Sequence, residues 1–410
     1  MEDKSSRRSF LAAGLALPAS ALASATRPVG LEQKPPKPPS EPARALQYRV
    51  LGKTGLKVST LGFGCMLTSD ASVIEKAADL GINYFDTARG YQGGNNERMV
   101  GAALKSRRKS VALSSKTGAP TKQAALDDLD TSLRELGTDY LDVWSLHGRS
   151  RASQITDEWL EAQQLAKKEG KIRFSGISTH SGQAEVIPAI ISKQPQIDVV
   201  QTSYNFSMSP EIEGLIESAS KAGVGVVAMK VMAGGFRRAR PGDRLYDTLK
   251  RDGAMLAALK WALRNRNVHT AVPSMTDLEQ LEENLRAMTA PFSEEDRKTL
   301  AARLEYIGPL YCRACGQCGG ACPQGLPVAD ILRYLSYAEG YGEYWLAREH
   351  FLALPARVRQ VRCSACARCA GSSRNSTMLL SLVHRIRPRY LSTHTSVCGS
   401  ACVKTLSPTI

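Results

Sequence analysis

Four polar residues that could share a proton during carbonyl chemistry follow three successive apolar runs of the sequence. Asp86 ends one run and Tyr91 lies five residues after it, whereas Lys116 and His147 lie at the ends of the next two runs. Hydride addition to a carbonyl produces an alkoxide that must be protonated as it forms. A tyrosine phenol has an ordinary pKa of about 10, and a neighbouring ammonium group lowers that pKa because it stabilises the phenolate.

These residue types predict a division of roles. We expect Tyr91 to be the general acid/base, Lys116 to lower its pKa and Asp86 to anchor Lys116. His147 would orient the carbonyl oxygen. Each residue alone has an ordinary structural interpretation, as a helix cap, a solvated lysine or a buried histidine. Their joint occurrence at successive strand ends favours the catalytic interpretation.

The runs that would position these residues alternate with longer amphipathic segments. Short β-rich runs separated by helical patterns predict parallel strands, and over about 250 residues the usual solution is a closed (β/α)8 barrel, in the α/β class. A doubly wound sheet is the rival, but Gly62-Phe63-Gly64 lacks the third glycine of a dinucleotide-binding turn. The predicted strands are 60–64, 82–86, 111–115, 140–146, 172–178, 199–203, 224–229 and 268–273.

Residues 48–290 resemble the aldo-keto reductase superfamily. The resemblance rests on the opening segment 48–59, on Phe85-Asp86-Thr87-Ala88 with Tyr91, on Ser115-Lys116-Thr117 and on Leu146-His147. It implies a barrel, spanning 48–305, that reduces a small aldehyde or ketone to an alcohol with NADP or NAD as cofactor. In that family the residues that match Asp86, Tyr91, Lys116 and His147 form the catalytic tetrad.

The same resemblance implies a set of cofactor contacts. Gln201 would hold the nicotinamide carboxamide, Tyr204 would stack on the nicotinamide ring, and Lys230 would meet the pyrophosphate. The segment after the eighth strand leads into a helix N-terminus, which suits a phosphate. Met275 and Thr276 stand where NADP-specific relatives carry a basic residue, so the choice between NADP and NAD stays open. The remaining predicted contacts are Ser178, Pro273, Ser274, Gln280, Glu283 and Asn284.

The last hundred residues hold nearly all of the cysteines. The run Cys312-x2-Cys315-x2-Cys318-x3-Cys322-Pro323 has the spacing of bacterial ferredoxins, and zinc is the less favoured alternative. A second run stops short, because Ser373 and Arg374 stand where cysteine and proline are expected. We predict a small α-helical ferredoxin-like domain over 306–370, holding one or two 4Fe–4S clusters. The predicted ligands are Cys312, Cys315, Cys318, Cys322, Cys363, Cys366 and Cys369.

Residues 371–410 differ in character from everything before them. They contain thirteen serines and threonines and no acidic residue. One hypothesis is that this tail is read in a shifted frame. The alternative is that Cys398 and Cys402 supply the ligand that the second cysteine run lacks.

The N-terminus has the features of an export signal. Arg7-Arg8-Ser9-Phe10-Leu11 precedes a short apolar run, and Ala23-Ser24-Ala25 is a plausible cleavage site. The arginine pair resembles the bacterial twin-arginine signal, although a disordered tail with a chance Arg-Arg pair is the alternative. We expect a signal peptide over 1–25, a proline-rich linker over 26–47 and a periplasmic or otherwise exported protein.

The net charge of +15 is spread along the chain rather than concentrated. No basic run is interleaved with aromatic residues, so a nucleic-acid partner is not expected, whereas a redox protein partner is possible. No apolar stretch reaches eighteen residues, so an integral membrane segment is not expected after signal removal. The alternative to an enzyme is a non-catalytic redox-sensing or electron-transfer subunit that binds nicotinamide nucleotide.

Overall fold

The computed structural model describes residues 46–233, 253–307, 312, 322–341 and 343–361. These residues belong to a single compact unit that begins at Ala45. The predicted signal peptide, the tail 371–410 and five of the predicted metal ligands lie outside the described residues, so those predictions are not tested. The five are Cys315, Cys318, Cys363, Cys366 and Cys369. Within the part that is described, no helix is long and apolar enough to cross a membrane.

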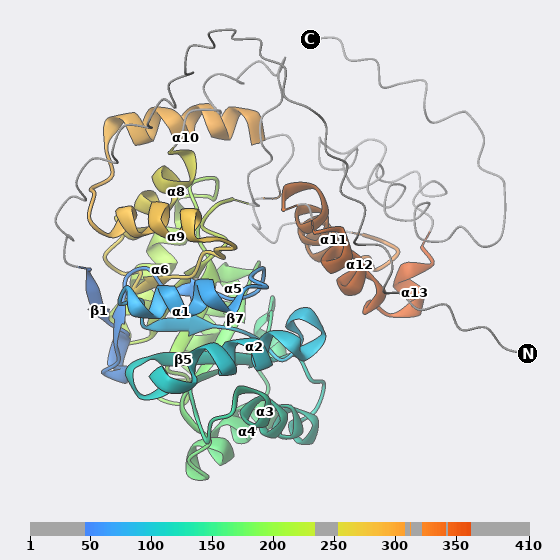
Figure 1. Cartoon of the computed structure of the whole chain (residues 1–410). Helices are drawn as coiled ribbons and strands as arrows, with labels where there is room; N and C mark the ends of the chain where they lie inside the picture. Colours follow the sequence, from blue (N-terminus) through green and yellow to red (C-terminus); the bar gives the residue numbers. More distant parts are fainter. Residues whose placement is uncertain (1–45, 234–252, 308–311, 313–321, 342, 362–410) are drawn as a thin grey trace, which may run out of the picture. The chain divides into compact units, whose positions relative to one another are not determined.

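Eight parallel strands form the barrel (Figure 1), which confirms the predicted (β/α)8 architecture of this part of the chain. Neighbouring strands pair in sequence order from β3 to β10. The sheet closes on itself through two further parallel bridges, Leu61 with Ala271 and Gly64 with Ser274. The strands are β3 Phe63–Gly64, β4 Tyr84–Asp86, β5 Ala112–Thr117, β6 Leu141–Leu146, β7 Ile172–Thr179, β8 Val199–Ser203, β9 Gly225–Met229 and β10 Thr270–Ala271.

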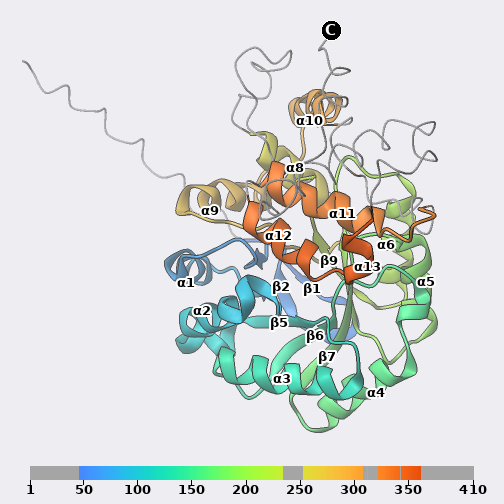
Figure 2. The same ribbon diagram turned by 90° about the vertical axis from the view of Figure 1, so that its right-hand side faces the viewer.

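Helices surround the strands (Figure 2), and their ends follow from local chemistry. Helix α1 begins one residue after Asp70, because the Asp70 carboxylate accepts a hydrogen bond from the Ser72 backbone N–H at 2.9 Å. Helix α3 ends at Gly137, whose φ of 63° suits glycine. The helices are α1 Ala71–Asp79, α2 Asn95–Leu104, α3 Lys122–Leu136, α4 Asp157–Lys168, α5 Gln183–Ser192, α6 Glu211–Lys221, α8 Ala254–Leu263 and α9 Leu278–Leu285.

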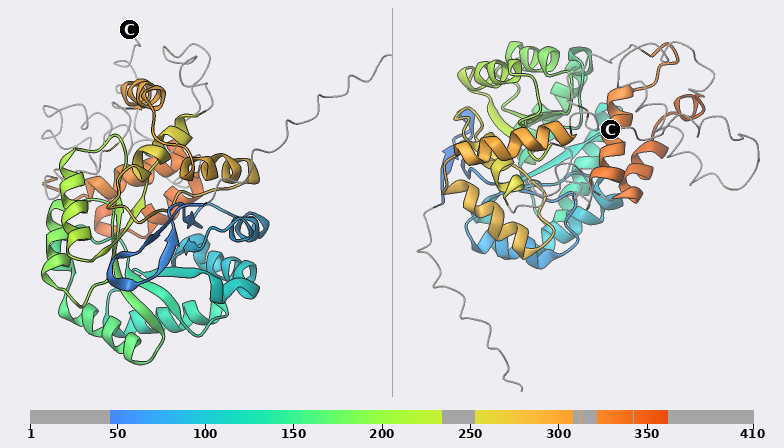
Figure 3. Two further views of the ribbon diagram at one scale, coloured as in Figure 1. Left: turned by 90° about the vertical axis from the view of Figure 1, so that its left-hand side faces the viewer. Right: turned by 90° about the horizontal axis from the view of Figure 1, so that it is seen from above.

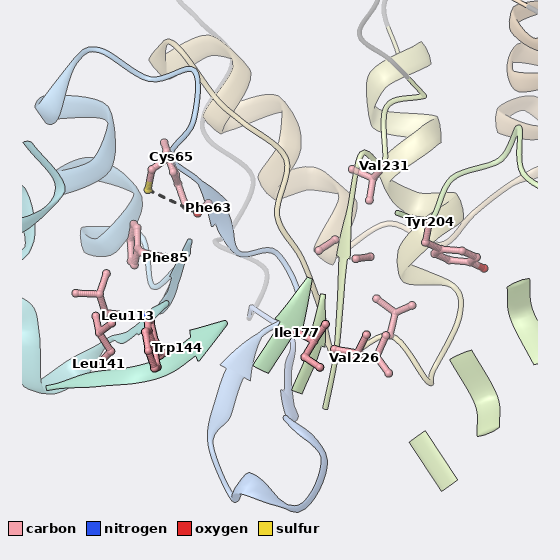
Figure 4. Close-up of a cluster of buried hydrophobic side chains, with 14 of the residues drawn as sticks. Phe63, Cys65, Phe85, Leu113, Leu141, Trp144, Ile177, Tyr204, Val226 and Val231 are labelled. Carbon is pink, nitrogen blue, oxygen red and sulfur yellow. Dashed lines mark hydrogen bonds between the residues drawn. The ribbon is translucent and has the colours of Figure 1, made fainter. Parts of the chain in front are cut away.

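Successive side chains along each strand point alternately inward and outward, so the core has two layers. The inward-pointing side chains fill the barrel interior, among them Tyr84, Val143, Val199 and Val227. Their chain neighbours Phe85, Trp144, Val200 and Val226 pack outward against the helices. Figure 4 shows part of this outer layer. Because successive strand residues point to opposite faces, the interior position of Tyr84 also directs Asp86 into the barrel.

A hairpin covers the end of the barrel where the strands begin. Strands β1 (Tyr48–Val50) and β2 (Lys57–Ser59) pair antiparallel, and the hairpin is the blue ribbon in the left panel of Figure 3. Leu51 is buried in the interior layer. The Lys53 backbone N–H donates to the Gly223 carbonyl at 2.8 Å, just before β9. The opposite end of the barrel, where the strands finish, therefore carries the mouth.

Five further helical segments follow the barrel. They are α10 Glu294–Ile307, α11 Val328–Leu335, a π-helical turn Ser336–Gly340, α12 Tyr344–Leu352 and α13 Ala356–Arg359. Leu326, Ile331, Leu335 and Val358 form one small hydrophobic cluster. A second cluster, with Tyr334, Tyr337, Leu346 and Ala347, also contacts Met66 and Leu67, which follow β3. The C-terminal helices therefore pack against the mouth of the barrel.

Barrel closure depends on a close approach of backbones at Gly64. A Cβ atom at this position would lie 2.7 Å from the Val272 carbonyl oxygen and 3.2 Å from that of Pro273. Gly64→Ala is therefore expected to lower the free energy of unfolding by about 1–3 kcal/mol, measured by chemical denaturation. Gly214→Ala, inside α6 with open space around it, is the control and should raise stability by about 0.5–1 kcal/mol. Equal effects of the two substitutions would contradict this account of closure.

Candidate active site

A buried ion pair lies at the centre of the barrel mouth. The Lys116 Nζ donates to Asp86 Oδ2 at 2.7 Å and to the Thr87 carbonyl at 2.7 Å, and both charged side chains are almost fully buried. The Gln201 Nε2 donates to the same carboxylate oxygen at 2.8 Å. Strand parity explains this meeting, because Asp86, Lys116 and Gln201 all lie an even number of residues from interior positions of their strands.

Tyr91 stands beside this pair on the loop that follows β4. The Lys116 ammonium lies 5.2 Å from the centroid of the Tyr91 ring. Two contacts hold the loop: the Arg89 backbone N–H donates to the Lys116 carbonyl at 2.9 Å, and the Thr87 hydroxyl donates to Asn96 Oδ1 at 2.6 Å. The structure therefore brings together the predicted acid, its neighbouring cation and the anchor.

His147 completes the group from the end of β6. Its ring meets that of Tyr91 edge-on, with centroids 5.8 Å apart. Ser178, at the end of β7, fixes this strand end, because its hydroxyl accepts the Gly148 backbone N–H at 2.8 Å. All four residues of the predicted tetrad thus lie at one mouth, as the sequence predicts. Ser178 acts on the position of His147 through the neighbouring backbone.

The electrostatics at Tyr91 differ from the prediction. Burial raises the pKa of Tyr91 well above its ordinary value, and the negative charge of Asp86 raises it further. The pKa of Tyr91 is therefore raised overall and not lowered as predicted, because burial and the charge of Asp86 outweigh any stabilisation of the phenolate by Lys116. Burial, followed by the charge of Lys116, lowers the pKa of His147 well below its ordinary value. At neutral pH the phenol is therefore protonated and the imidazole is neutral.

Tyr204 does not face the mouth, so its predicted stacking on nicotinamide is corrected. Its ring is fully buried in the outer layer (Figure 4) and packs on Trp261 with centroids 4.7 Å apart. Its hydroxyl donates to Glu213 at 2.9 Å. The side chain that points into the barrel at the neighbouring strand end is Met229. Strand parity was the signal available, since Tyr204 lies an odd number of residues from the inward-facing Gln201.

The predicted phosphate site at the start of α9 carries hydrogen bonds from its own side chains. Asp277 caps this helix, and its carboxylate accepts the Gln280 backbone N–H at 2.8 Å. The Gln280 side chain folds back onto the same turn, where its Oε1 accepts the Thr276 N–H at 3.1 Å. A carboxylate and an amide therefore occupy two backbone donors at this helix start, those of Gln280 and Thr276. Of the other predicted contacts in this region, Pro273 and Asn284 are buried and Ser274 and Glu283 are partly exposed.

The mouth itself suits the nicotinamide end of NAD(P)H. Two buried polar atoms near the strand ends have no hydrogen-bond partner among the described residues: Asp86 Oδ1 and His180 Nδ1. Buried polar groups are normally satisfied, so these atoms fit a ligand that carries its own donors and acceptors, as a carboxamide does. The Ser178 hydroxyl and the Gln201 amide lie at the same strand ends.

Residues of the C-terminal helices reach the mouth, which the sequence did not predict. The Lys230 Nζ, after β9, donates to the Tyr337 hydroxyl at 3.4 Å and lies 4.6 Å from the centroid of that ring. Arg333 and Tyr337 both act electrostatically on Tyr91. The spacing of these two residues, one helical turn apart in α11 and the turn that follows, was the only signal for a shared face.

The cysteine region is described only in part. Cys312 and Cys322 are partly buried and pack against the same hydrophobic cluster, formed by residues such as Leu326 and Ile331. Among the residues that the structure describes, no group of three or more histidine, cysteine, aspartate or glutamate side chains is arranged to hold a metal. The predicted cluster thus depends on residues outside this part of the chain.

The buried ion pair gives a prediction for stability. Asp86→Asn leaves the Lys116 ammonium buried without a counter-ion, so we expect the free energy of unfolding to fall by about 3–5 kcal/mol, as measured by denaturant titration. The control is Glu217→Gln, which breaks an exposed pair with Lys221 and should cost no more than about 0.5 kcal/mol. If Asp86→Asn lowered the free energy of unfolding as little as the control does, the ion pair would not stabilise the fold.

Comparison with known proteins agrees with this geometry. The sequence profile of the Aldo/keto reductase family matches residues 67–305. The solved structure of aldo-keto reductase AKR11C1 from Bacillus halodurans in its holo form is 30% identical, covers 67% of this chain and 99% of its own, and superposes with a TM-score of 0.55. The oxidoreductase YqkF of Bacillus subtilis is 29% identical over 297 residues, 62% of this chain and 95% of its own. L-glyceraldehyde 3-phosphate reductase of Escherichia coli O157:H7 is 26% identical over 313 residues, 61% of this chain and 90% of its own. The chain belongs to the aldo/keto reductase family and is an oxidoreductase.

Proposed function

We propose that this protein reversibly reduces an aldehyde or ketone to an alcohol with NADPH or NADH. The observation that carries the proposal is the convergence of Tyr91, His147 and the buried Lys116–Asp86 pair at one mouth of the barrel. Family membership supports the same reaction class, since enzymes of this family generally use NAD(P)H. Family membership does not identify the carbonyl substrate, so we propose only that it is a small molecule.

When bound, the nicotinamide supplies the hydride. The chain's own residues manage the proton and the developing charge. His147, neutral at physiological pH, donates a hydrogen bond from its ring N–H to the carbonyl oxygen and so orients it. Tyr91, protonated at the same pH, transfers the proton of its hydroxyl to the oxygen as negative charge develops there. The Lys116 ammonium then stabilises the phenolate that remains, while Asp86 keeps the ammonium in place.

We further propose that the C-terminal cysteines hold one or two 4Fe–4S clusters. The ferredoxin spacing of Cys312, Cys315, Cys318 and Cys322 supports this. So does the position of Cys312 and Cys322 beside one hydrophobic cluster, since both ends of the run lie in the same neighbourhood. The clusters would exchange electrons with a redox protein partner or brace the C-terminal helices. The Arg7-Arg8 signal supports export through the twin-arginine pathway, which transports folded proteins and so would suit a protein loaded with clusters.

The raised pKa of Tyr91 leads to a pH prediction. Reduction needs the protonated phenol, which persists below the pKa and is lost as pH rises through it. Because that pKa is raised and the pKa of His147 is lowered, kcat for reduction should stay flat from about pH 7 to about pH 10. Tyr91→Phe should lower kcat by about 100-fold or more at every pH in this range.

The control for this experiment is Tyr140→Phe, which alters a phenol on the face of Arg108, away from the tetrad. It should leave kcat unchanged. An apparent pKa below about 9 in the wild-type profile, abolished by Tyr91→Phe, would contradict the raised pKa. Unaltered turnover in Tyr91→Phe would remove this residue from the mechanism.

The iron–sulfur proposal has a separate test. Protein purified without oxygen should contain iron and acid-labile sulfide and should show the broad visible absorbance of an iron–sulfur cluster. Double replacement of Cys312 and Cys322 by serine should remove most of the iron and absorbance. Cys65→Ser, which changes a buried thiol within the barrel, should retain both. Iron-free protein, or zinc in its place, would overturn the proposal.

A further inference from the structure

A small cavity lies between the barrel mouth and helix α11. Its lining includes His180 after β7, Ser203 at the end of β8, Lys230 after β9, Asp330 and Arg333 of α11, and Cys312, one of the proposed cluster ligands. Its volume is about 40 Å³. On a scale where one water needs roughly 10–15 Å³, that space accepts a group of about three heavy atoms, which is the size of a carboxylate.

The charges around this cavity are unbalanced. Arg333 Nη2 donates to Asp330 Oδ1 at 2.9 Å, but Arg333 Nε is buried with no partner among the described residues. Among the described residues, Lys230 donates to the Tyr337 hydroxyl alone and has no carboxylate within ion-pair distance. Within this part of the chain, one carboxylate therefore faces two cations in the cavity lining. Partly desolvated cations without a counter-ion are costly, and an anion in the cavity would offset that cost.

His180 adds a hydrogen-bonding group and connects the cavity to the reacting centre. Its Nδ1 is buried without a partner among the described residues, and its ring centroid lies 6.4 Å from that of His147. Burial and then the charge of Arg333 lower the pKa of His180, so the ring is neutral and the cations supply the positive potential. The distance from His147 corresponds to a few covalent bonds of about 1.5 Å each.

We propose that Arg333 and Lys230 form a subsite for a carboxylate on the substrate, an inference that rests on the proposed carbonyl reduction. The substrate class is then a short oxo acid, with its carbonyl at Tyr91 and His147 and its carboxylate between His180 and Arg333. The pyrophosphate of the cofactor is the other source of an oxyanion. The cavity favours the carboxylate, because a diphosphate has many more heavy atoms than this space accepts.

The test compares 4-oxobutanoate with its methyl ester, which has the same carbonyl and no charge. In the full-length protein with NADPH, Arg333→Gln should lower kcat/KM for the acid by at least about 10-fold, mainly through KM. It should change kcat/KM for the ester by less than about 2-fold. Arg333→Lys should lose less than Arg333→Gln on the acid. Arg357→Gln removes an exposed arginine of α13 and should leave both substrates unaffected.

Two results would overturn the subsite. Equal losses on the acid and the ester would mean that Arg333 acts only on the fold or on the tetrad. Weaker NADPH binding in Arg333→Gln, measured by nucleotide fluorescence and matching the loss in kcat/KM, would assign the anion to the cofactor. Failure of the proposed function is distinguishable, because the wild type would then reduce neither compound. In that case the binding of succinate is measured by calorimetry. Binding to the NADPH-loaded wild type and not to Arg333→Gln would support the subsite. Binding to both proteins or to neither would overturn it.

Discussion

The mouth of this barrel is organised around one buried ion pair. A lysine and an aspartate with almost no solvent exposure would be costly if either charge were left unsatisfied. The structure supplies the missing partners: a backbone carbonyl for the second bond of Lys116, and the Gln201 amide for Asp86. These contacts connect β4, β5 and β8 across the barrel interior, so the register of three strands and the position of the pair depend on one another.

The catalytic arrangement follows from that constraint. The loop after β4 is tied to the Lys116 backbone through Arg89, so Tyr91 is placed relative to the same residue that supports its charge. His147 is held from β7 by Ser178. The phenol is not made acidic in the resting protein, because burial raises the pKa of Tyr91 and the negative charge of Asp86 raises it further. In the proposed reaction, Lys116 stabilises Tyr91 only when negative charge develops on the phenol oxygen.

Much of this could be predicted from the sequence because it rests on periodicity. The alternation of apolar runs and helical patterns predicts the barrel, and the strand-end positions of Asp86, Lys116 and His147 bring them together for geometric reasons. The prediction for Tyr204 was wrong because it followed the resemblance to the family and ignored the alternation of inward and outward side chains along β8. The Asp277 cap at the start of α9 could also be predicted, because aspartate is a preferred N-cap residue.

The contribution of the C-terminal helices could not be predicted in the same way. Lys230 and Tyr337 are 107 residues apart in the chain, and no local pattern specifies a contact over that distance. The cysteine spacing of this region directed attention to metal binding rather than to the residues between the two cysteine runs. Arg333 and Tyr337 are ordinary helix residues in the sequence, and only the packing of α11 against the mouth gives them a place near Tyr91.

The central claim, that Lys116 and Asp86 act as one interdependent pair, is tested most directly by a double-mutant cycle on the free energy of unfolding. The four proteins are the wild type, Asp86→Asn, Lys116→Met and the double variant. We expect the double variant to be more stable than the sum of the single losses implies, with a coupling energy of about 2–3 kcal/mol. Additive losses, within about 0.5 kcal/mol, would contradict the account.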